Sequence, residues 1–292
     1  MVSSQRQIVL SLVRAFTSHP QGGNPAGVVQ LATAVADEGA TAEIGAIQTS
    51  QLQQLAAQSA QPVTAFVWPV VGGYQIRWFT PSMEINLCGH GTLAAAAVLF
   101  SQQAQRSRLQ FYSAYGEMTV ERSDTGLCLQ LPCFALQSIA VSDLPHKVTQ
   151  GLTIAAAFGR DLILELANAD AVRAYQPDFT AMRQLSWHAV LVTALSETAA
   201  VEGTPCYVLR YFAPSIGIDE DPATGSAHCS LLPYWQAKKP QPEQRWRAQQ
   251  YSNAGGDFVL QQQGSVLRLT SQAVLLGQRQ LDWPLTNSTF DR

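Results

Sequence analysis

Apolar residues along the chain fall mostly into short runs that alternate with polar positions, a pattern that predicts strands. Runs rich in β-branched or aromatic residues lie at 8–16, 26–31, 63–68, 74–79, 108–113, 117–122, 127–131, 188–194, 206–212, 257–262 and 265–270. Helical spacing predicts fewer elements, near 43–59, 90–103, 143–157, 178–185 and 225–237, with Ser142 and Asp178 as N-caps. Because strands outnumber helices without alternating regularly with them, the sequence predicts an α+β fold with mixed or antiparallel sheets.

Two of the predicted helices are apolar on every side, at 93–100 and 227–235. A helix of this kind has to be surrounded by protein, so each is expected to form the centre of its own domain. The segment 132–145, bounded by two prolines, is the expected connection. We therefore predict an N-terminal domain at 1–131, to which the segment 272–292 returns, and a C-terminal domain at 132–271, with a functional cleft between them.

The composition favours a protein that acts on a small molecule. Its 292 residues suit two domains, only 13% of them are charged, and the formal net charge of −3 comes with no cluster of Lys and Arg. These values argue against a nucleic-acid partner or an anionic membrane surface. The five cysteines form no CxxC pair and no apolar run is long enough to span a membrane, so we expect reduced thiols and a cytoplasmic location. No spacing typical of a metal site or a phosphate loop occurs, so neither a metal site nor a nucleotide site is predicted.

Two segments place reactive side chains at the start of the two apolar helices. They are Leu87-Cys88-Gly89-His90-Gly91-Thr92 and Glu220-Asp221-Pro222-Ala223-Thr224-Gly225-Ser226. Backbone N–H groups at a helix start carry partial positive charge and bind anions such as carboxylates. An unperturbed imidazole titrates near neutral pH, so His90 in such a turn predicts proton transfer on a bound carboxylate. His228, by contrast, lies on an apolar helix and is expected to be a core residue.

Six motifs in order resemble those of the PhzF-like isomerases of phenazine-biosynthesis type, which share the diaminopimelate-epimerase fold. They are Ala15-Phe16-Thr17 with Gly23-Asn24-Pro25-Ala26-Gly27-Val28-Val29, Thr64-Ala65-Phe66-Val67, Arg77-Trp78-Phe79-Thr80-Pro81, Leu87-Cys88-Gly89-His90-Gly91-Thr92, and Glu220-Asp221-Pro222-Ala223-Thr224-Gly225-Ser226-Ala227-His228. The resemblance implies two pseudo-symmetric domains, each a sheet wrapped around a central helix, with the active site between them. It also implies that no metal or organic cofactor is used and that the protein is a homodimer.

The resemblance further implies roles for individual residues. His90 and Asp221 take the catalytic positions, and the expected substrate-binding residues are Asn24, Gly89, Gly91, Thr92, Thr224, Gly225 and Ser226. The family's principal acid/base Glu directly precedes the Thr-Ala-Phe strand, and here that position is Val63. Valine neither accepts nor donates a proton, so the chemistry has either changed or been lost.

Three functions are consistent with these residues. The first is a cofactor-independent isomerase that moves a proton on a small carboxylate or amino-carboxylate, with His90 as the proton carrier and Asp221 orienting. The second is a catalytically silent family member that binds a small molecule or a protein partner. The third is an amino-acid racemase that uses Cys88, which the sequence disfavours because Ala223 stands where such racemases carry their second cysteine.

Overall fold

The structure, a computed structural model, describes residues 7–32, 35–36, 47–114, 116–197, 203–240 and 245–283. It consists of two compact units. Unit 1 comprises Met1–Ala15, Pro25–Glu121 and Ala273–Arg292, and unit 2 comprises Phe16–Asn24 and Arg122–Gln272. The division therefore lies at 121/122 instead of the predicted 131/132. The C-terminal segment contributes a strand to unit 1 at Ala273–Asp282, and residues 284–292 lie outside the described part.

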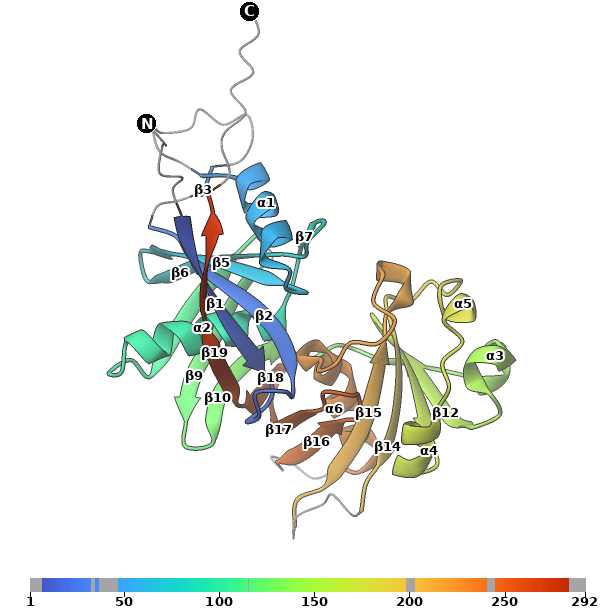
Figure 1. The fold of residues 1–292 in the computed structure, drawn as a ribbon. Helices are drawn as coiled ribbons and strands as arrows, with labels where there is room; N and C mark the ends of the chain where they lie inside the picture. Colours follow the sequence, from blue (N-terminus) through green and yellow to red (C-terminus); the bar gives the residue numbers. More distant parts are fainter. Residues whose placement is uncertain are drawn as a thin grey trace, which may run out of the picture. The chain divides into compact units, whose positions relative to one another are not determined.

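Unit 1 is a mixed sheet built from strands at both ends of the chain. Its strands are β1 (Gln7–Ala15), β2 (Asn24–Gln30), β5 (Thr64–Val70), β6 (Gly73–Phe79), β7 (Glu84–Ile85), β8 (Arg108–Ser113), β9 (Gly116–Ser123) and β19 (Ala273–Asp282). β1 runs antiparallel to β19 along its whole length, as Figure 1 shows, and also pairs with β2. β2 is parallel to β5, β5 antiparallel to β6, β6 parallel to β8, and β8 antiparallel to β9. A short parallel pair, β3 (Val35–Ala36) and β4 (Ile47–Gln48), precedes the first helix.

Two helices pack against the unit 1 sheet. α1 (Thr49–Ser59) contributes Leu52 and Leu55 to a core that includes the edge-to-face pair Phe66 and Phe79. α2 (Gly89–Gln102) packs against β1, β5 and β19, and every residue from Gly91 to Phe100 is buried. The prediction of an apolar helix surrounded by protein is confirmed for this segment.

The strands of unit 2 also pair in mixed directions. Its strands are β10 (Gly126–Pro132), β11 (Gln137–Ile139), β12 (Thr153–Phe158), β13 (Leu162–Leu166), β14 (Val190–Leu195), β15 (Cys206–Phe212), β16 (Trp246–Gln250), β17 (Gly256–Gln263) and β18 (Val266–Ser271). Neighbours pair in chain order from β11 to β18, and β10 then pairs with β18. The pairs β13–β14 and β15–β16 are parallel and the others antiparallel. The α+β class with mixed sheets is thus confirmed.

The helices of unit 2 are short except for one. They are α3 (His146–Thr149), α4 (Ala169–Ala174), α5 (Phe179–Met182) and α6 (His228–Lys238), with 3₁₀ turns η1 (Val141–Asp143), η2 (Pro214–Ile216) and η3 (Gly225–Ala227). α6 packs against β17 and β18 and buries Trp235, whose Nε1 donates to Thr193 Oγ1 at 3.1 Å. At its C-terminal end Tyr234 and Lys238 both bind the buried carboxylate of Glu165, which fixes α6 to β13.

The helix predicted at 143–157 is mostly wrong. Only His146–Thr149 is helical, because Gln150 and Gly151 adopt left-handed φ angles of 54° and 67° that end the helix. The chain then forms β12, which pairs with β13. Ser142 caps no helix, since it lies inside η1, whereas Asp178 caps α5 as predicted by accepting the Ala181 N–H at 2.9 Å. Of the helix predicted from 43, the part at 43–46 lies outside the described residues.

Candidate functional site

The carboxylate of Asp221 is held by side chains from widely separated parts of unit 2. Its Oδ1 accepts from Asn24 Nδ2 at 2.7 Å, and its Oδ2 accepts from Thr224 Oγ1 at 2.5 Å. Its own backbone N–H donates to the carbonyl of Tyr211 on β15 at 3.0 Å. Asn24 is buried and also donates to the carbonyl of Ala223 at 2.8 Å. The Asn24 side chain therefore fixes both the Asp221 carboxylate and the turn that follows it.

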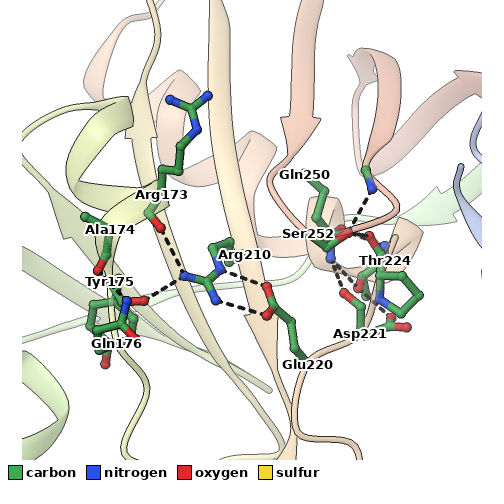
Figure 2. Close-up of polar contacts among 12 residues, drawn as sticks. Arg173, Ala174, Tyr175, Gln176, Arg210, Glu220, Asp221, Thr224, Gln250 and Ser252 are labelled. Carbon is green, nitrogen blue, oxygen red and sulfur yellow. Dashed lines mark hydrogen bonds and ion pairs between the residues drawn. The ribbon is translucent and has the colours of Figure 1, made fainter.

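Gln250, at the end of β16, completes this arrangement (Figure 2). Its Nε2 donates to the Asp221 carbonyl at 2.6 Å and to Thr224 Oγ1 at 3.2 Å, and its Oε1 accepts the Thr224 N–H at 2.7 Å. Because Thr224 Oγ1 accepts from Gln250, its hydrogen is directed at Asp221. Ser252 adds a bond from its hydroxyl to the carbonyl of Pro222 at 2.6 Å. The turn 221–224 is thus bonded to the neighbouring strand at several points.

This environment makes Asp221 an acid or base suited to neutral pH. Burial raises the pKa of Asp221 from 3.8 to about 6, an effect that outweighs the opposing hydrogen bonds from Thr224 and Asn24. A group whose pKa lies near the working pH transfers protons most effectively. The side chain is half-buried, so part of it stays accessible.

Two residues predicted to bind substrate, Asn24 and Thr224, use their side-chain donors within unit 2. Both N–H bonds of the Asn24 amide have acceptors in Asp221 and Ala223. The hydroxyl and the backbone N–H of Thr224 donate to Asp221 and Gln250. In this structure both residues position Asp221, and their direct contact with substrate stays a prediction.

The turn Cys88-Gly89-His90-Gly91 of unit 1 begins helix α2. Cys88 is the N-cap, and its Sγ accepts the Gly91 N–H at 3.3 Å and lies 3.5 Å from His90 Nδ1. Thr92 Oγ1 donates to the Cys88 carbonyl at 2.8 Å. Cysteine and histidine thus form a close pair, whereas the Gly91 N–H and the Thr92 hydroxyl are bonded within the turn.

The expectation that His90 titrates near neutral pH needs correction. Burial lowers the pKa of His90 from 6.5 to about 4. The imidazole is therefore neutral at pH 7, and its protonated form would release its proton readily. Of the two predicted catalytic residues, Asp221 is the one with a pKa close to neutrality.

A glycine in each turn is required by a close aromatic neighbour. A Cβ at Gly91 would lie 2.9 Å from Trp78 Cδ1 and 3.0 Å from Cys88 Sγ. A Cβ at Gly225 would lie 2.7 Å from Cζ of Phe16. Real Cβ contacts are longer, so a larger residue would displace either turn.

The sequence predicts that Val63 stands where the family has its acid/base Glu. The residue is 5% exposed, and its carbonyl accepts the Gly27 N–H at 2.9 Å, immediately before β5 begins. The nearby carboxylate Glu84 forms a two-point ion pair with Arg77, at 2.7 and 2.6 Å. Glu220 forms one with Arg210, at 2.8 and 3.0 Å (Figure 2). Both carboxylates are therefore paired with arginines.

A second polar network of unit 2 includes Ser226, one of the predicted site residues. Arg160 Nη2 donates to Ser226 Oγ at 3.2 Å and to Tyr211 Oη at 3.3 Å. The same guanidinium makes two bonds to the carboxylate of Asp161, at 3.0 and 2.8 Å. Arg160, Gln250 and Ser252 could not be predicted from the sequence, because none of them belongs to a recognisable motif.

A cavity of about 580 Å³ lies beside the Asp221 turn in unit 2. Polar residues line it, among them Arg173, Arg210, Glu220, Gln250 and Ser252. Arg210 also donates to the backbone carbonyl of Tyr175 at 2.7 Å, so all three nitrogens of its guanidinium form hydrogen bonds (Figure 2). Neither Asp221 nor Thr224 is part of the lining, but Gln250 and Ser252 line the cavity and also form hydrogen bonds with the Asp221 turn.

His228 is a core residue, as the sequence predicts. It is fully buried, its Nδ1 lies 2.7 Å from Tyr207 Oη, and its ring lies 4.2 Å from that of Phe258. In the part of the chain that the structure describes, no three His, Cys, Asp or Glu side chains converge as a metal site would require. Over the same residues no helix is long and apolar enough to cross a membrane.

Comparisons with known sequences agree on one family. A family model described as phenazine biosynthesis-like protein matches residues 13–276. An uncharacterised isomerase of Pseudomonas aeruginosa is 38% identical over 273 residues, covering 92% of this chain and 97% of that protein. An uncharacterised isomerase of Vibrio cholerae is 38% identical over 256 residues, covering 87% of this chain and 84% of that protein.

Solved structures show the same relationship. A PhzF-family phenazine biosynthesis protein of Enterococcus faecalis superimposes with a TM-score of 0.82 at 29% identity, covering 94% of this chain and 99% of the other. A probable proline racemase of Agrobacterium radiobacter gives a TM-score of 0.61 at 10% identity, covering 96% of this chain and 94% of the other. The second likeness concerns the fold alone.

Proposed function

The chain belongs to the phenazine biosynthesis-like (PhzF) family, and on that premise we propose that it is a cofactor-independent isomerase that moves a proton on a small carboxylate or amino-carboxylate. The observation that carries the proposal is the state of Asp221. Burial raises its pKa to about 6, and Asn24 and Thr224 fix the orientation of its carboxylate. These are the properties required of a group that accepts a proton and returns it.

In this proposal Asp221 takes over the transfer that Val63 cannot perform. At pH 7 most of the carboxylate is ionised and accepts a proton from carbon. Once protonated, the same group can return the proton to a different carbon of the substrate. His90, neutral because its pKa is lowered to about 4, is the second residue that we assign to the reaction. Its contact with Cys88 Sγ at 3.5 Å restrains the ring.

A second function is favoured by a specific observation, the burial of Val63. The residue that replaces the family Glu is apolar, 5% exposed and packed at the start of β5. A chain that had lost its base would retain a ligand site and perform no proton transfer. The alternative is therefore a catalytically silent binder of a small molecule or a protein.

The two functions differ in the exchange of a substrate proton with solvent. We expect the wild-type protein to introduce deuterium from D₂O into at least one member of a panel of small amino acids, hydroxy acids and cyclic unsaturated carboxylates, as followed by NMR. We expect His90→Ala to reduce that rate about 100-fold or more, because one proton-transferring group is lost. His146→Ala is the matched control, since His146 is exposed on α3. Binding of the panel without any exchange would support the silent binder instead.

A further inference from the structure

The guanidinium of Arg160 is only partly used by the protein. Arg160 is the residue before β13, and its neighbour Asp161 is completely buried, whereas the Arg160 side chain is 30% exposed. Its Nε and Nη2 bind Asp161, Tyr211 and Ser226. Among the described residues no acceptor lies within hydrogen-bond distance of Nη1. Two N–H donors of a partly exposed cation therefore remain available.

The neighbouring Ser226 hydroxyl is available as a donor as well. A guanidinium has donors and no acceptors, so Ser226 Oγ is the acceptor in its 3.2 Å contact with Arg160 Nη2. The hydroxyl hydrogen then points elsewhere, and no acceptor for it lies among the described residues. Ser226 is half-buried, so a ligand can reach it.

The arrangement is rigid before any ligand arrives. Asp161 holds the guanidinium at two points, and Tyr211 accepts from Nη2 while donating toward Asp161 at 3.5 Å. The ring of Phe134 lies 5.5 Å from the guanidinium carbon and supports its face. Tyr211 also connects this network to the proposed catalytic carboxylate, because its carbonyl accepts the Asp221 N–H.

We propose that Arg160 and Ser226 form a carboxylate-binding site in unit 2, with Arg160 Nη1 and the Ser226 hydroxyl donating to the two oxygens of a substrate carboxylate. The proposal rests on the proposed function, since it assigns the acidic group of the same substrate class. A planar guanidinium and an adjacent O–H match the two oxygens of a carboxylate and leave a neutral carboxamide, whose NH₂ is a donor, poorly paired. Arg160 is therefore a binding residue that also neutralises Asp161.

The test measures binding separately from proton exchange. Acetate, benzoate and L-proline, each with its carboxamide, are titrated into the full-length protein while the arginine Nε–H signals are followed by NMR. Wild type should bind at least one carboxylate in preference to its amide. Arg160→Lys and Ser226→Ala should each weaken that binding about tenfold or more, because a charge-assisted hydrogen bond is lost. Arg183→Lys is the control, since Arg183 forms an exposed ion pair with Asp219 in the same unit.

Several outcomes would overturn the inference: no carboxylate binding in wild type, equal binding of acid and amide, or full binding in Arg160→Lys. Lysine keeps a cation beside Asp161, so the variant is expected to fold, and its unfolding curve checks this. If Arg160→Lys does not fold, Ser226→Ala tests the site instead, because removing that hydroxyl leaves the Arg160–Asp161 pair intact. Full carboxylate binding in Ser226→Ala would then overturn the inference. Proton exchange reports on the proposed function alone. Carboxylate binding that depends on Arg160, without proton exchange, would refute the isomerase and support the binding site. Proton exchange together with binding that does not depend on Arg160 would support the isomerase and refute the binding site.

Discussion

Asp221→Asn is expected to lower the rate of proton exchange by about 10²- to 10⁴-fold, the range typical of a lost general acid or base. Asparagine has nearly the same shape and can still accept from Asn24, but it carries no titrating proton. The wild-type rate should fall as the pH drops through about 6, because protonated Asp221 no longer accepts a proton. That pH dependence should disappear in the variant.

The matched control for this prediction is Asp219→Asn. Asp219 lies two positions earlier in the same turn region and forms only an exposed ion pair with Arg183 at 2.8 Å. Its replacement should leave both the rate and the pH profile unchanged. Denaturant unfolding of both variants establishes that the fold is retained. A rate for Asp221→Asn within about threefold of wild type would show that the base lies elsewhere, since the loss expected is far larger.

The second large effect concerns the stability of unit 2. Burial lowers the pKa of His228 from 6.5 to about 3, because the charged ring would lie in the core against Tyr207 and Phe258. Between these pH values the unfolded chain binds the proton and the folded protein does not. The contribution of His228 is therefore fully present above about pH 6.5 and is lost as the pH falls toward 3. For this group the free energy of unfolding should fall by about 3 kcal/mol between pH 7 and pH 4.

The variant that isolates this contribution is His228→Phe, which keeps an aromatic ring and removes the titration. It should be less stable than wild type at pH 7 by about 1–2 kcal/mol, because the buried Tyr207 hydroxyl loses its partner. Its free energy of unfolding should change with pH by about 3 kcal/mol less than that of wild type. His146→Gln removes an exposed histidine of the same unit and should retain the wild-type pH dependence. If His228→Phe and wild type lose stability in parallel, His228 is not the group responsible.

Sequence patterns predicted the central helices and most strands, because these depend on apolar periodicity within a short segment. They failed where a local conformation interrupted such a pattern. The run 143–157 has helical spacing, yet the left-handed Gln150 and Gly151 end α3 and the remainder pairs as β12. β16 and β19 were also missed, since the many polar residues in Trp246–Gln250 and Ala273–Asp282 hide their alternation.

Residues of the candidate site could be predicted from the sequence only where they belong to a recognisable motif. His90, Asp221 and Ser226 lie in turns with recognisable residue order, and the replacement of the family Glu by Val63 stays a prediction from the same kind of motif. Arg160 and Gln250 were not found, because their contacts with Ser226 and Thr224 join residues far apart in the chain. The pKa values of His90 and Asp221 could not be predicted from the sequence either, since they depend chiefly on burial.

In the proposed function this chain transfers a proton without a carboxylate at position 63. Deuterium uptake from D₂O, measured by NMR for wild type and Val63→Glu side by side on the same carboxylate panel, tests it most directly. We expect exchange in wild type and no requirement for the added carboxylate. No deuterium uptake in wild type, together with uptake in Val63→Glu, would rule out the isomerase and would identify the natural protein as a binder that has lost its base.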